Sequence, residues 1–422
     1  MPAASAAAEV RAAAARLREA GRALRRRPRA EIALVLGAQL ELLRDSTSSI
    51  RARLAAELPA ATGFHPATLA AGLQAGFAPW TAKAFSELIQ RELGSDPGRI
   101  ASGFPLTAVV LGGAIPMPTV LQLLAPLALG SPVLLRPGSR DPVSARAVAL
   151  ELARLDPELG RCIEVVPFPY VDSAALDALA GADCVVASGS DEAVAAIAGR
   201  VRPWQRFVGY GHRFSIAALG RDGDLNASCA ALARDVALWD QLGCLSPIAL
   251  AAVGWRWEER AALLNELEAA FAKQAGAWPA GVLDADAAAQ RANEVATCEM
   301  RAAAGEGADL RRDPGRSWAL LADRDPGFRG SPLHRVLRVR FVESADALEA
   351  WLAPVAHHLA SVGVSGFGVE ASLGLARRLT RLGASRVCRF GEMQAPPISW
   401  SHDGQGVLTP LARFTDLELP AK

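Results

Sequence analysis

Short apolar runs alternate with segments of helical periodicity from residue 107 onward. Apolar runs of four to eight residues are typical of buried parallel strands, and apolar residues three and four positions apart indicate helices. Strands are predicted at TAVVLGG (107–113), PVLLRP (132–137), IEVVPF (163–168) and DCVVASGS (183–190). Predicted helices follow them at 119–129, 143–155, 174–179 and 191–198. This alternation predicts a doubly wound α/β domain.

A second α/β unit follows the Gly-Tyr-Gly break at 209–211. The segment RFVGYGHRFSIAALG (206–220) places strand-like runs on both sides of that break, as expected where a chain crosses between domains. The pattern then predicts helices at 224–239, 257–273, 284–303 and from 345, with strands at 248–253, 317–321 and 335–342. Residues 386–422 hold short strands and a Pro-rich loop, and we expect this tail to return to the sheet or to a neighbouring subunit.

Two segments could be mistaken for a targeting signal or a membrane span. Residues 4–27 predict an amphipathic surface helix and not a targeting signal, because Glu9 and Glu19 interrupt the basic residues and no apolar segment follows. The segment Ile100–Leu135 carries no charge and is long enough for a membrane span. Its glycines and prolines divide it into shorter pieces, so a buried β-α-β unit explains it better.

The composition is that of an ordinary globular protein. Half of the 422 residues are apolar and the formal net charge is +1, so no field of one sign attracts nucleic acid or an anionic membrane. We therefore expect a soluble, cytoplasmic protein. The cysteines form no CxxC pair and have no histidines at metal-ligand spacing, so neither a zinc site nor a disulfide framework is indicated.

Cys244 in LWDQLGCLSP is the best candidate for a nucleophile. It follows Gly243 and precedes Ser246-Pro247, a turn-like setting in which backbone N–H groups can point at the sulfur and lower its pKa from about 8.5. A buried structural cysteine is the alternative at this point, since that is the commonest fate of the residue type.

Two strand-to-helix turns could hold a nucleotide. In SGSDE (188–192), free amides at Ser188, Gly189 and Ser190 could bind a phosphate, although the same residues could simply cap a helix. In LLRPGSR (134–140), a strand ends at Arg136 beside the turn formed by Pro137, Gly138 and Ser139. Arg136 and Arg140 could bind ribose hydroxyls or a 2′-phosphate, or could simply be solvated.

An ordered series of motifs resembles a known superfamily. VVLGGAIPMP, PVLLRPGS, VVASGSDEAV, VGYGHRFSI and WDQLGCLSP, in this order, resemble the aldehyde dehydrogenases. GEMQAPPISWSHDG (391–404) and LARFTDLE (411–418) are similar to the C-terminal signature of a narrower group, the LuxC-like acyl-CoA and acyl-protein reductases that supply aldehyde for bacterial bioluminescence. The resemblance runs from about residue 60 to the end.

The resemblance implies a role for each matching residue. Cys244 matches the nucleophile, and Arg136 stands where a lysine usually binds the cofactor ribose. Gly138 and Ser139, Ser188 to Ser190, and Gly209 are expected around the cofactor. The fold implied is a Rossmann-type cofactor domain (101–211) and an α/β catalytic domain (212–388), with an N-terminal helical segment (1–100) and a C-terminal segment (389–422).

Departures from the superfamily pattern favour reduction over oxidation. The strand motif that normally presents a glutamate base reads Phe-Val-Gly-Tyr-Gly at 207–211 and contains no carboxylate. Met117 and Pro118 stand where an asparagine usually binds the oxyanion, and no glutamate for the nicotinamide ribose lies near Ser331. Without a base, water cannot readily hydrolyse an acyl-enzyme, which suits reduction of a thioester.

We therefore expect an NADPH-dependent acyl reductase, with NADH as the alternative cofactor. Its expected partners are an acyl-CoA or acyl-protein donor, an acyl-protein synthetase and further copies of the chain. An NAD(P)+-dependent aldehyde dehydrogenase and a non-reducing acyl carrier are the alternatives. His212 and Arg213 are expected at the surface, and His402-Asp403-Gly404 is predicted to form an Asx-type turn without a catalytic role.

Overall fold

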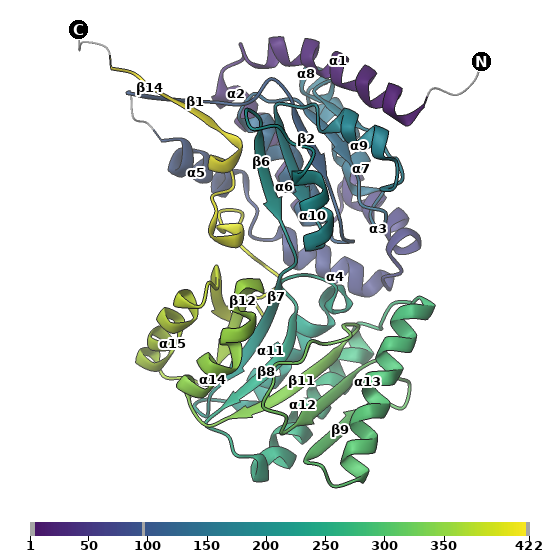
Figure 1. Ribbon diagram of the computed structural model, residues 1–422, viewed down its shortest axis with the longest axis vertical. Coiled ribbons are helices and arrows are strands. Elements are labelled where there is room, and N and C mark those ends of the chain that lie inside the picture. The colour runs from purple at the N-terminus through teal and green to yellow at the C-terminus, as the bar shows by residue number, and fades with distance from the viewer. Residues whose placement is uncertain (1–4, 95–97, 419–422) are drawn as a thin grey trace.

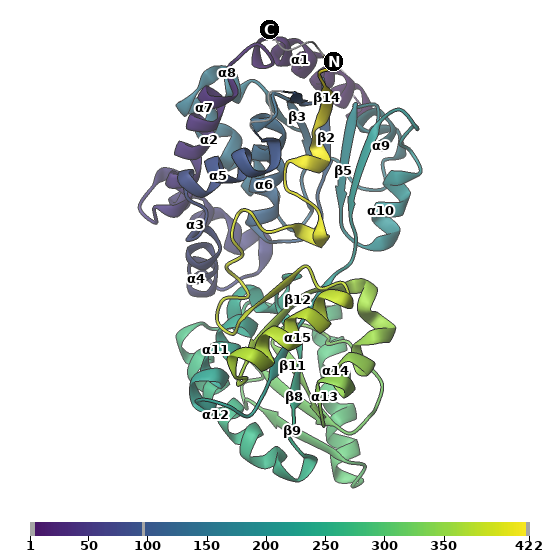
Figure 2. The same ribbon diagram turned by 90° about the vertical axis from the view of Figure 1, so that its left-hand side faces the viewer.

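The protein consists of two lobes, each built around one sheet. The computed structural model describes residues 5–94 and 98–418, and the two sheets are stacked along the long axis of the molecule (Figures 1 and 2). The predicted fold class, a Rossmann-type sheet followed by a second α/β unit and preceded by helices, is confirmed.

The first sheet has five parallel strands in the order β4-β3-β2-β5-β6. They are β2 (Thr107–Val110), β3 (Val133–Arg136), β4 (Ile163–Val165), β5 (Cys184–Ser188) and β6 (Arg206–Tyr210). The strand order reverses between β2 and β5. The carboxyl ends of the strands at such a switch point are where open α/β sheets bind ligands.

Helices cover both faces of the first sheet. Helix α1 (Ala6–Leu24) buries Val10, Ala13 and Leu17, whose helical spacing forms one apolar stripe against the sheet. Its face of the sheet also carries α9 (Ser173–Leu179) and α10 (Asp191–Ala198). The other helices of this lobe are α2 (Arg29–Arg44), α3 (Ser49–Thr62), α4 (Pro66–Phe77), α5 (Ala82–Leu93), α6 (Pro116–Ala128), α7 (Ser144–Leu155) and α8 (Pro157–Gly160).

The uncharged segment 100–135 folds as predicted into the unit β2-α6-β3. Helix α6 buries nearly its whole surface, because it lies between the sheet and helices α2 and α7. Within residues 5–94 and 98–418, no helix is both long enough and apolar enough to cross a bilayer.

The second sheet has the strand order β13-β12-β7-β8-β11-β10-β9 and is parallel except at β9, which runs antiparallel to β10. Its strands are β7 (Phe214–Leu219), β8 (Pro247–Val253), β9 (Ala308–Arg312), β10 (Ala319–Asp323), β11 (Val336–Val342), β12 (Leu359–Ser365) and β13 (Arg386–Arg389). Helices α11 (Leu225–Ala237) and α12 (Arg260–Ala277) cover one face, and α13 (Ala285–Ala303), α14 (Ala345–Leu352) and α15 (Val369–Arg381) cover the other.

Strands β9 and β12 and helix α15 were not predicted from the sequence pattern. β12 reads LASVGVS, in which small residues dilute the apolar alternation. Gly363 in this strand is required for packing, since a Cβ there would lie 2.5 Å from the sulfur of Met393. β9 reads ADLRR and forms the sheet edge, where charged residues are common because they prevent further strand pairing.

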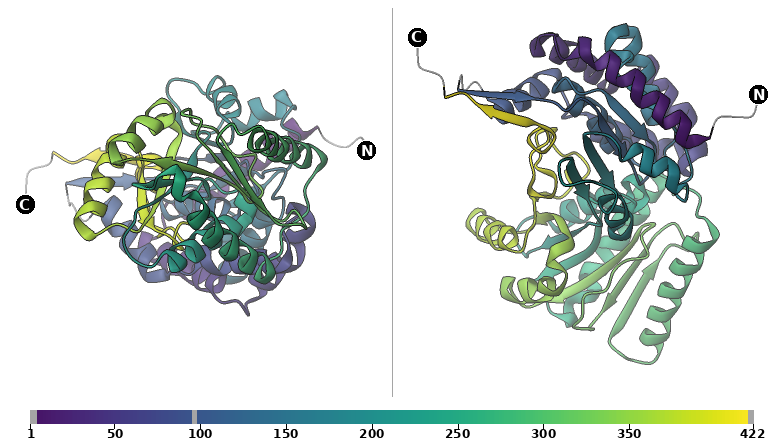
Figure 3. Two further views of the ribbon diagram at one scale, coloured as in Figure 1. Left: turned by 90° about the horizontal axis from the view of Figure 1, so that it is seen from below. Right: turned by 45° about the horizontal axis from the view of Figure 1, so that its top comes forward.

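The C-terminal segment returns from the second lobe to the first (Figures 2 and 3). After β13 joins the second sheet, the chain crosses to the first lobe, where β14 (Arg413–Asp416) pairs antiparallel with β1 (Arg99–Ser102). The Glu92 carboxylate anchors it by accepting N–H bonds from Val407, Leu408 and Thr409 at 2.8–2.9 Å. Short 3-10 helices lie at Leu238–Gln241, Trp257–Glu259, Ala353–His358, His402–Gly404 and Thr409–Leu411.

Candidate active site

Loops from one edge of each sheet meet between the lobes. β6 ends at Tyr210 and β7 begins at Phe214, so the carboxyl edge of the first sheet faces the amino edge of the second. Because β7, β8, β10, β11 and β12 are parallel, the loops that precede them lie at that same edge. Cys244, in the loop before β8, therefore lies between the lobes.

The chain before Cys244 adopts an unusual backbone conformation. Trp239, Asp240 and Gln241 all have positive φ angles, of 58°, 48° and 65°. Non-glycine residues in this region cost of order 1 kcal/mol each and persist only when their surroundings hold them. The Trp239 ring fills the space beside Gly72, where a Cβ would lie 2.7 Å from it, and the Gln241 amide donates to the Pro247 carbonyl at 2.8 Å.

A buried ion pair ties this turn to a second one. Asp240 accepts a bond of 2.7 Å from Arg335, and the two side chains are 7% and 2% exposed. Arg335 ends another run of left-handed residues, 333–335, and also donates to the carbonyls of Trp278 and Pro279 at 2.6 and 3.1 Å. The turn that presents Cys244 is thus fixed by residues 95 positions further along the chain.

The Cys244 turn is also held by the C-terminal signature. Ser215 donates to the Cys244 carbonyl at 2.7 Å, and the Gln394 amide donates to Ser246 at 3.2 Å. Gln394 is itself held by a bond of 3.2 Å to the carbonyl of Asp235, whose carboxylate accepts the N–H of Gly391 at 2.6 Å. The two segments that carried the sequence resemblance therefore meet in space.

Cys244 is half-buried, and its pKa differs from the sequence-based expectation. The backbone N–H groups of Cys244 and Leu245 act to lower the pKa of the sulfur, as predicted. Burial acts in the opposite direction and dominates, and the negative charge of Asp403 adds to it. Together they raise the pKa of the thiol to about 11, so the expected lowering is wrong in this structure.

The charge of Asp403 acts on this cysteine, and the His402 imidazole lies 3.8 Å from the Asp403 carboxylate, in a segment for which the sequence predicted only a turn. The Asp403 side chain is 3% exposed, and it lies 3.2 Å from the Arg213 guanidinium instead of accepting a backbone bond in an Asx turn. His212 is exposed as expected, whereas Arg213 is only half-exposed because it pairs with this carboxylate. The charges of Asp403 and Arg213 shift the pKa of Cys244 in opposite directions, which places both near its sulfur.

The imidazole of His402 is fixed by aromatic neighbours. It stacks on Tyr210 with ring centroids 4.7 Å apart and contacts Trp400 at 4.8 Å. Burial lowers the pKa of His402, and the cation Arg213 lowers it further while Asp403 opposes the shift. No local sequence signal links the His402–Asp403 segment to Cys244, because the two segments lie far apart along the chain.

Three glycine-containing loops converge at the carboxyl edge of the first sheet. A Cβ on Gly138 would lie 3.0 Å from the Gly113 carbonyl, and a Cβ on Gly112 would lie 3.0 Å from the Ser188 carbonyl. The loops after β2, β3 and β5 can therefore approach only because these residues lack side chains. Gly113, with φ of 90°, has open space beyond it, as a dinucleotide cradle requires.

The other predicted cofactor residues occupy this edge in different ways. Ser190 caps α10, because its hydroxyl accepts the Ala193 N–H at 3.2 Å. The Gly189 N–H donates to the Tyr210 carbonyl at 3.2 Å. Ser139 is exposed. Gly209 lies inside β6, where a Cβ would meet Val194 at 2.9 Å, so it admits helix α10.

Arg136 and Arg140, the two arginines of the β3 turn, are unequally accessible. Arg136 is buried and donates to the carbonyls of Phe168 and Leu111 at 3.2 and 3.3 Å. Arg140 is 51% exposed and lies 3.4 Å from Asp284 of the second lobe.

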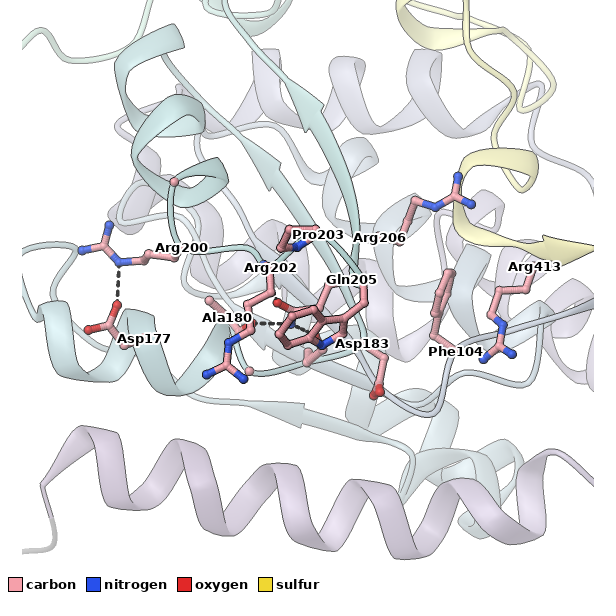
Figure 4. Close-up of a pocket in the computed structure, with 14 residues that line it drawn as sticks. Phe104, Asp177, Ala180, Asp183, Arg200, Arg202, Pro203, Gln205, Arg206 and Arg413 are labelled. Carbon is pink, nitrogen blue, oxygen red and sulfur yellow. Dashed lines mark hydrogen bonds and ion pairs between the residues drawn. The ribbon is translucent and has the colours of Figure 1, made fainter.

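A large cavity lies away from the Cys244 site. It measures about 830 Å³ and lies at the amino ends of β5 and β6, the edge of the first sheet that faces away from Cys244. Figure 4 shows Arg200 paired with Asp177, and Arg413 beside Phe104. The described residues that line this cavity include no cysteine, serine, threonine or histidine.

This architecture defines the aldehyde dehydrogenase class of fold, and solved structures bear it out. The chain is similar to an NAD-dependent aldehyde dehydrogenase from Sinorhizobium meliloti, with a TM-score of 0.73 and 18% identity over 99% of this chain and 88% of that one. It is also similar to a putative methylmalonate-semialdehyde dehydrogenase from S. meliloti 1021 complexed with NAD, with a TM-score of 0.75 and 18% identity over 99% and 91% of the two chains.

Within that class the chain belongs to the acyl-CoA reductase (LuxC) family, whose model matches residues 98–414. It is 24% identical to the long-chain acyl-protein thioester reductase of Aliivibrio fischeri over 315 residues, which are 74% of this chain and 63% of that protein. It is 22% identical to the enzyme of the same name from Vibrio harveyi, over 74% of this chain and 64% of that protein. The match thus spans less than two thirds of these relatives.

Proposed function

We propose that this protein is an NADPH-dependent reductase that converts a fatty acyl thioester to an aldehyde through an acyl-enzyme on Cys244. The observation that carries the proposal is the placement of Cys244. It is a half-buried thiol in the loop before β8, at the junction of the two sheets, and the N–H groups of Cys244 and Leu245 act on its sulfur. Its neighbour Gly243 lies against Ile115 of the loop that follows β2, since a Cβ on Gly243 would lie 2.7 Å from that side chain. Membership of the acyl-CoA reductase family favours this direction of reaction.

Acyl transfer is the first step of the proposed reaction. The Cys244 sulfur attacks the carbonyl carbon of the donor thioester, a new C–S bond forms, and the bond to the donor thiol breaks. The thiol proton passes to a base and then to the departing sulfur, so charge and protons balance. The N–H groups of Cys244 and Leu245 are the donors available at the reacting end, in place of the side-chain amide missing at Met117.

His402 is the proposed proton acceptor for Cys244. With its pKa lowered by burial, the imidazole is neutral near pH 7 and can accept a proton. The neighbouring Asp403 carboxylate, 3.8 Å from Nε2, would stabilise the imidazolium that forms, and Arg213 holds that carboxylate. The raised pKa of Cys244 makes such a base necessary.

The residues at the first sheet fit a nicotinamide dinucleotide. Gly112, Gly113, Gly138 and the loop of Ser188 form the cradle, and the accessible Arg140 is the group best placed for an added phosphate. When bound, the cofactor would supply the hydride that reduces the acyl group. The proposed donor is an acyl-CoA or an acyl-protein, delivered in the second case by an acyl-protein synthetase, in the cytoplasm.

Asp403 also supports a second candidate function, oxidation of an aldehyde to an acid. Residues 207–211 contain no carboxylate, but Asp403 brings one to the site from the C-terminal segment. Because Arg213 pairs with it, this carboxylate is poorly suited to activate water, and reduction is favoured. Incubating the protein with myristoyl-CoA and NADPH distinguishes reduction of the thioester from oxidation of the aldehyde. The proposal expects tetradecanal and no acid, and acid as the main product would overturn it.

The first prediction concerns the pH dependence of the Cys244 thiol. His402→Gln is expected to slow alkylation of Cys244 by iodoacetamide at pH 7 about 100-fold, because the thiol loses its proton acceptor. Both proteins should react faster as the pH rises toward the thiol pKa of about 11. The difference between them should be largest near pH 7, where the imidazole of the unaltered protein is neutral, because burial lowers its pKa, and can still accept the thiol proton.

Two controls accompany this measurement. His212→Gln removes an exposed imidazole and should leave the profile unchanged. His402→Phe keeps an aromatic ring against Tyr210 and should behave like His402→Gln. Superimposable pH profiles for the unaltered protein and both His402 variants would show that the imidazole takes no proton from Cys244.

The second prediction concerns cofactor preference. Replacing Arg136 and Arg140 with alanine should raise the KM for NADPH roughly tenfold more than the KM for NADH, because a guanidinium pairs strongly with a 2′-phosphate. Arg140→Ala alone is the sharper test, since Arg136 is buried and its loss also removes two bonds to carbonyls. Equal effects on the two cofactors would refute the assignment.

A further inference from the structure

A second cavity, of about 610 Å³, lies in the second lobe at the edge that faces the first. Helix α13 forms one wall, and the residues before β10 and β11 form the other. Its walls are mainly apolar, with Val295, Trp318 and several alanines. Its charged lining residues are Asp240, Arg291, Arg312 and Arg316.

Arg291 is a buried cation for which the described part of the chain supplies no ion-pair partner. Its residue is 8% exposed, and its Nε is buried without a hydrogen-bond acceptor. Among residues 5–94 and 98–418, no carboxylate lies within ion-pair distance of it. The acid whose charge acts on Arg291, Asp313, already accepts bonds from the N–H and hydroxyl of Ser317 at 3.0 and 2.5 Å. A buried guanidinium without a counter-charge destabilises the folded protein unless an anion of a ligand pairs with it.

The other charges of the cavity leave it positive. Arg316 is exposed and makes no ion pair within the described part of the chain. Arg312 is paired with Glu299 at 3.1 Å, and the carboxylate of Asp240 is already neutralised by Arg335. Arg291 and Arg316 therefore repel each other across the cavity, an arrangement that an anion between them would relieve.

The position of the cavity indicates the kind of anion. His334 lines the cavity, and the charges of Arg140 and Asp284 act on its pKa. Arg140, in the turn after β3, lies 3.4 Å from Asp284, at the start of α13. The cavity thus adjoins both the proposed nucleotide edge and, through Asp240, the turn that presents Cys244. An anion on a larger organic molecule, whose remaining atoms pack on the apolar wall, fits this setting better than a free ion.

We propose that Arg291 and Arg316 form a phosphate-binding subsite for a nucleotide-bearing substrate, the CoA of the acyl donor or the nicotinamide dinucleotide. This inference rests on the proposed function only for its choice of ligands. The guanidinium pair binds the phosphate group, which is common to both sources. Arg316 at the rim captures it, and Arg291 completes its hydrogen bonds inside.

Binding measured without turnover tests the subsite. Calorimetry on the full chain carrying Cys244→Ala would compare CoA, 3′-dephospho-CoA, NADPH and NADH, with pantetheine as a phosphate-free probe. Arg316→Ala and Arg291→Met should each weaken at least one phosphate ligand roughly tenfold and leave pantetheine unchanged. Arg301→Ala is the matched control, because Arg301 lies on the same helix, is paired with Glu306 and does not line the cavity.

The pattern of losses identifies the source of the phosphate. A loss seen for CoA but not for 3′-dephospho-CoA assigns the 3′-phosphate, a loss seen for NADPH but not for NADH assigns the 2′-phosphate, and a loss for all assigns the pyrophosphate. If Arg316→Ala binds every ligand as Arg301→Ala does, the subsite is wrong, whether or not Arg291→Met folds. A protein that makes no aldehyde, but whose Arg316→Ala variant loses nucleotide affinity, would overturn the proposed reaction and leave the subsite standing.

Discussion

Cys244→Ala is expected to reduce aldehyde formation by on the order of 10⁵-fold, because the reaction proceeds through a covalent bond to this sulfur. Binding of the nicotinamide cofactor should be unchanged, since the cradle of Gly112, Gly113 and Gly138 lies on the other lobe. Initial rates with myristoyl-CoA and NADPH, together with cofactor titration by fluorescence, measure the two effects separately.

The matched control is Cys388→Ala, which removes the other half-buried thiol. Cys388 lies on β13, and burial raises its pKa to about 11, as it does for Cys244. Cys388 lies within a strand and not in the loop before β8, so we expect its removal to leave the rate within about twofold. A Cys244→Ala protein that retained most of its activity would show that another group carries the acyl chain.

The second large effect is expected at the buried pair Asp240–Arg335. Asp240→Ala should lower the free energy of unfolding by about 3–5 kcal/mol, because it leaves the Arg335 guanidinium uncompensated among buried groups. It should also lower kcat more than it raises KM, since the left-handed turn before Cys244 loses the bond that holds it. Urea unfolding and steady-state kinetics measure these quantities.

A double-mutant cycle distinguishes the pair from a general effect of truncation. Asp240→Ala combined with Arg335→Met should cost less than the sum of the single changes, because neither partner is then left alone. The surface pair Arg221–Glu259 is the control, and its removal should change the free energy of unfolding far less, because solvent screens such a pair. Additive single effects, or a kcat unchanged in a folded Asp240→Ala protein, would contradict the proposed positioning role.

Much of the fold could be predicted from apolar patterning. The strands of the first sheet are buried on both faces and therefore read as continuous apolar runs, and helix α10 was predicted with its observed bounds, Asp191–Ala198. The pattern failed where burial does not require large apolar residues. β12 packs through glycine and serine, and β9 is a charged edge strand.

The site was only partly accessible to sequence reasoning. The candidate Cys244 came from a local turn and a motif resemblance, both of which are short-range signals. The partners Arg335, Gln394 and Asp403 lie 91 to 159 residues away along the chain, and only the crossing of the C-terminal segment brings the last two into place. The direction of the Cys244 pKa shift was missed for the same reason, since burial is a property of the whole fold.

The central claim is a covalent acyl group on Cys244 that waits for reduction. Incubation with myristoyl-CoA in the absence of cofactor, followed by proteolysis and mass spectrometry, tests it most directly. We predict a myristoyl adduct on the Cys244 peptide that persists in buffer, because the Asp403 carboxylate is paired with Arg213 and does not activate water. Addition of NADPH should remove the adduct and release an equal amount of tetradecanal. An adduct on Cys229 or Cys298, or one that water discharges as myristate before NADPH is added, would contradict the proposed mechanism.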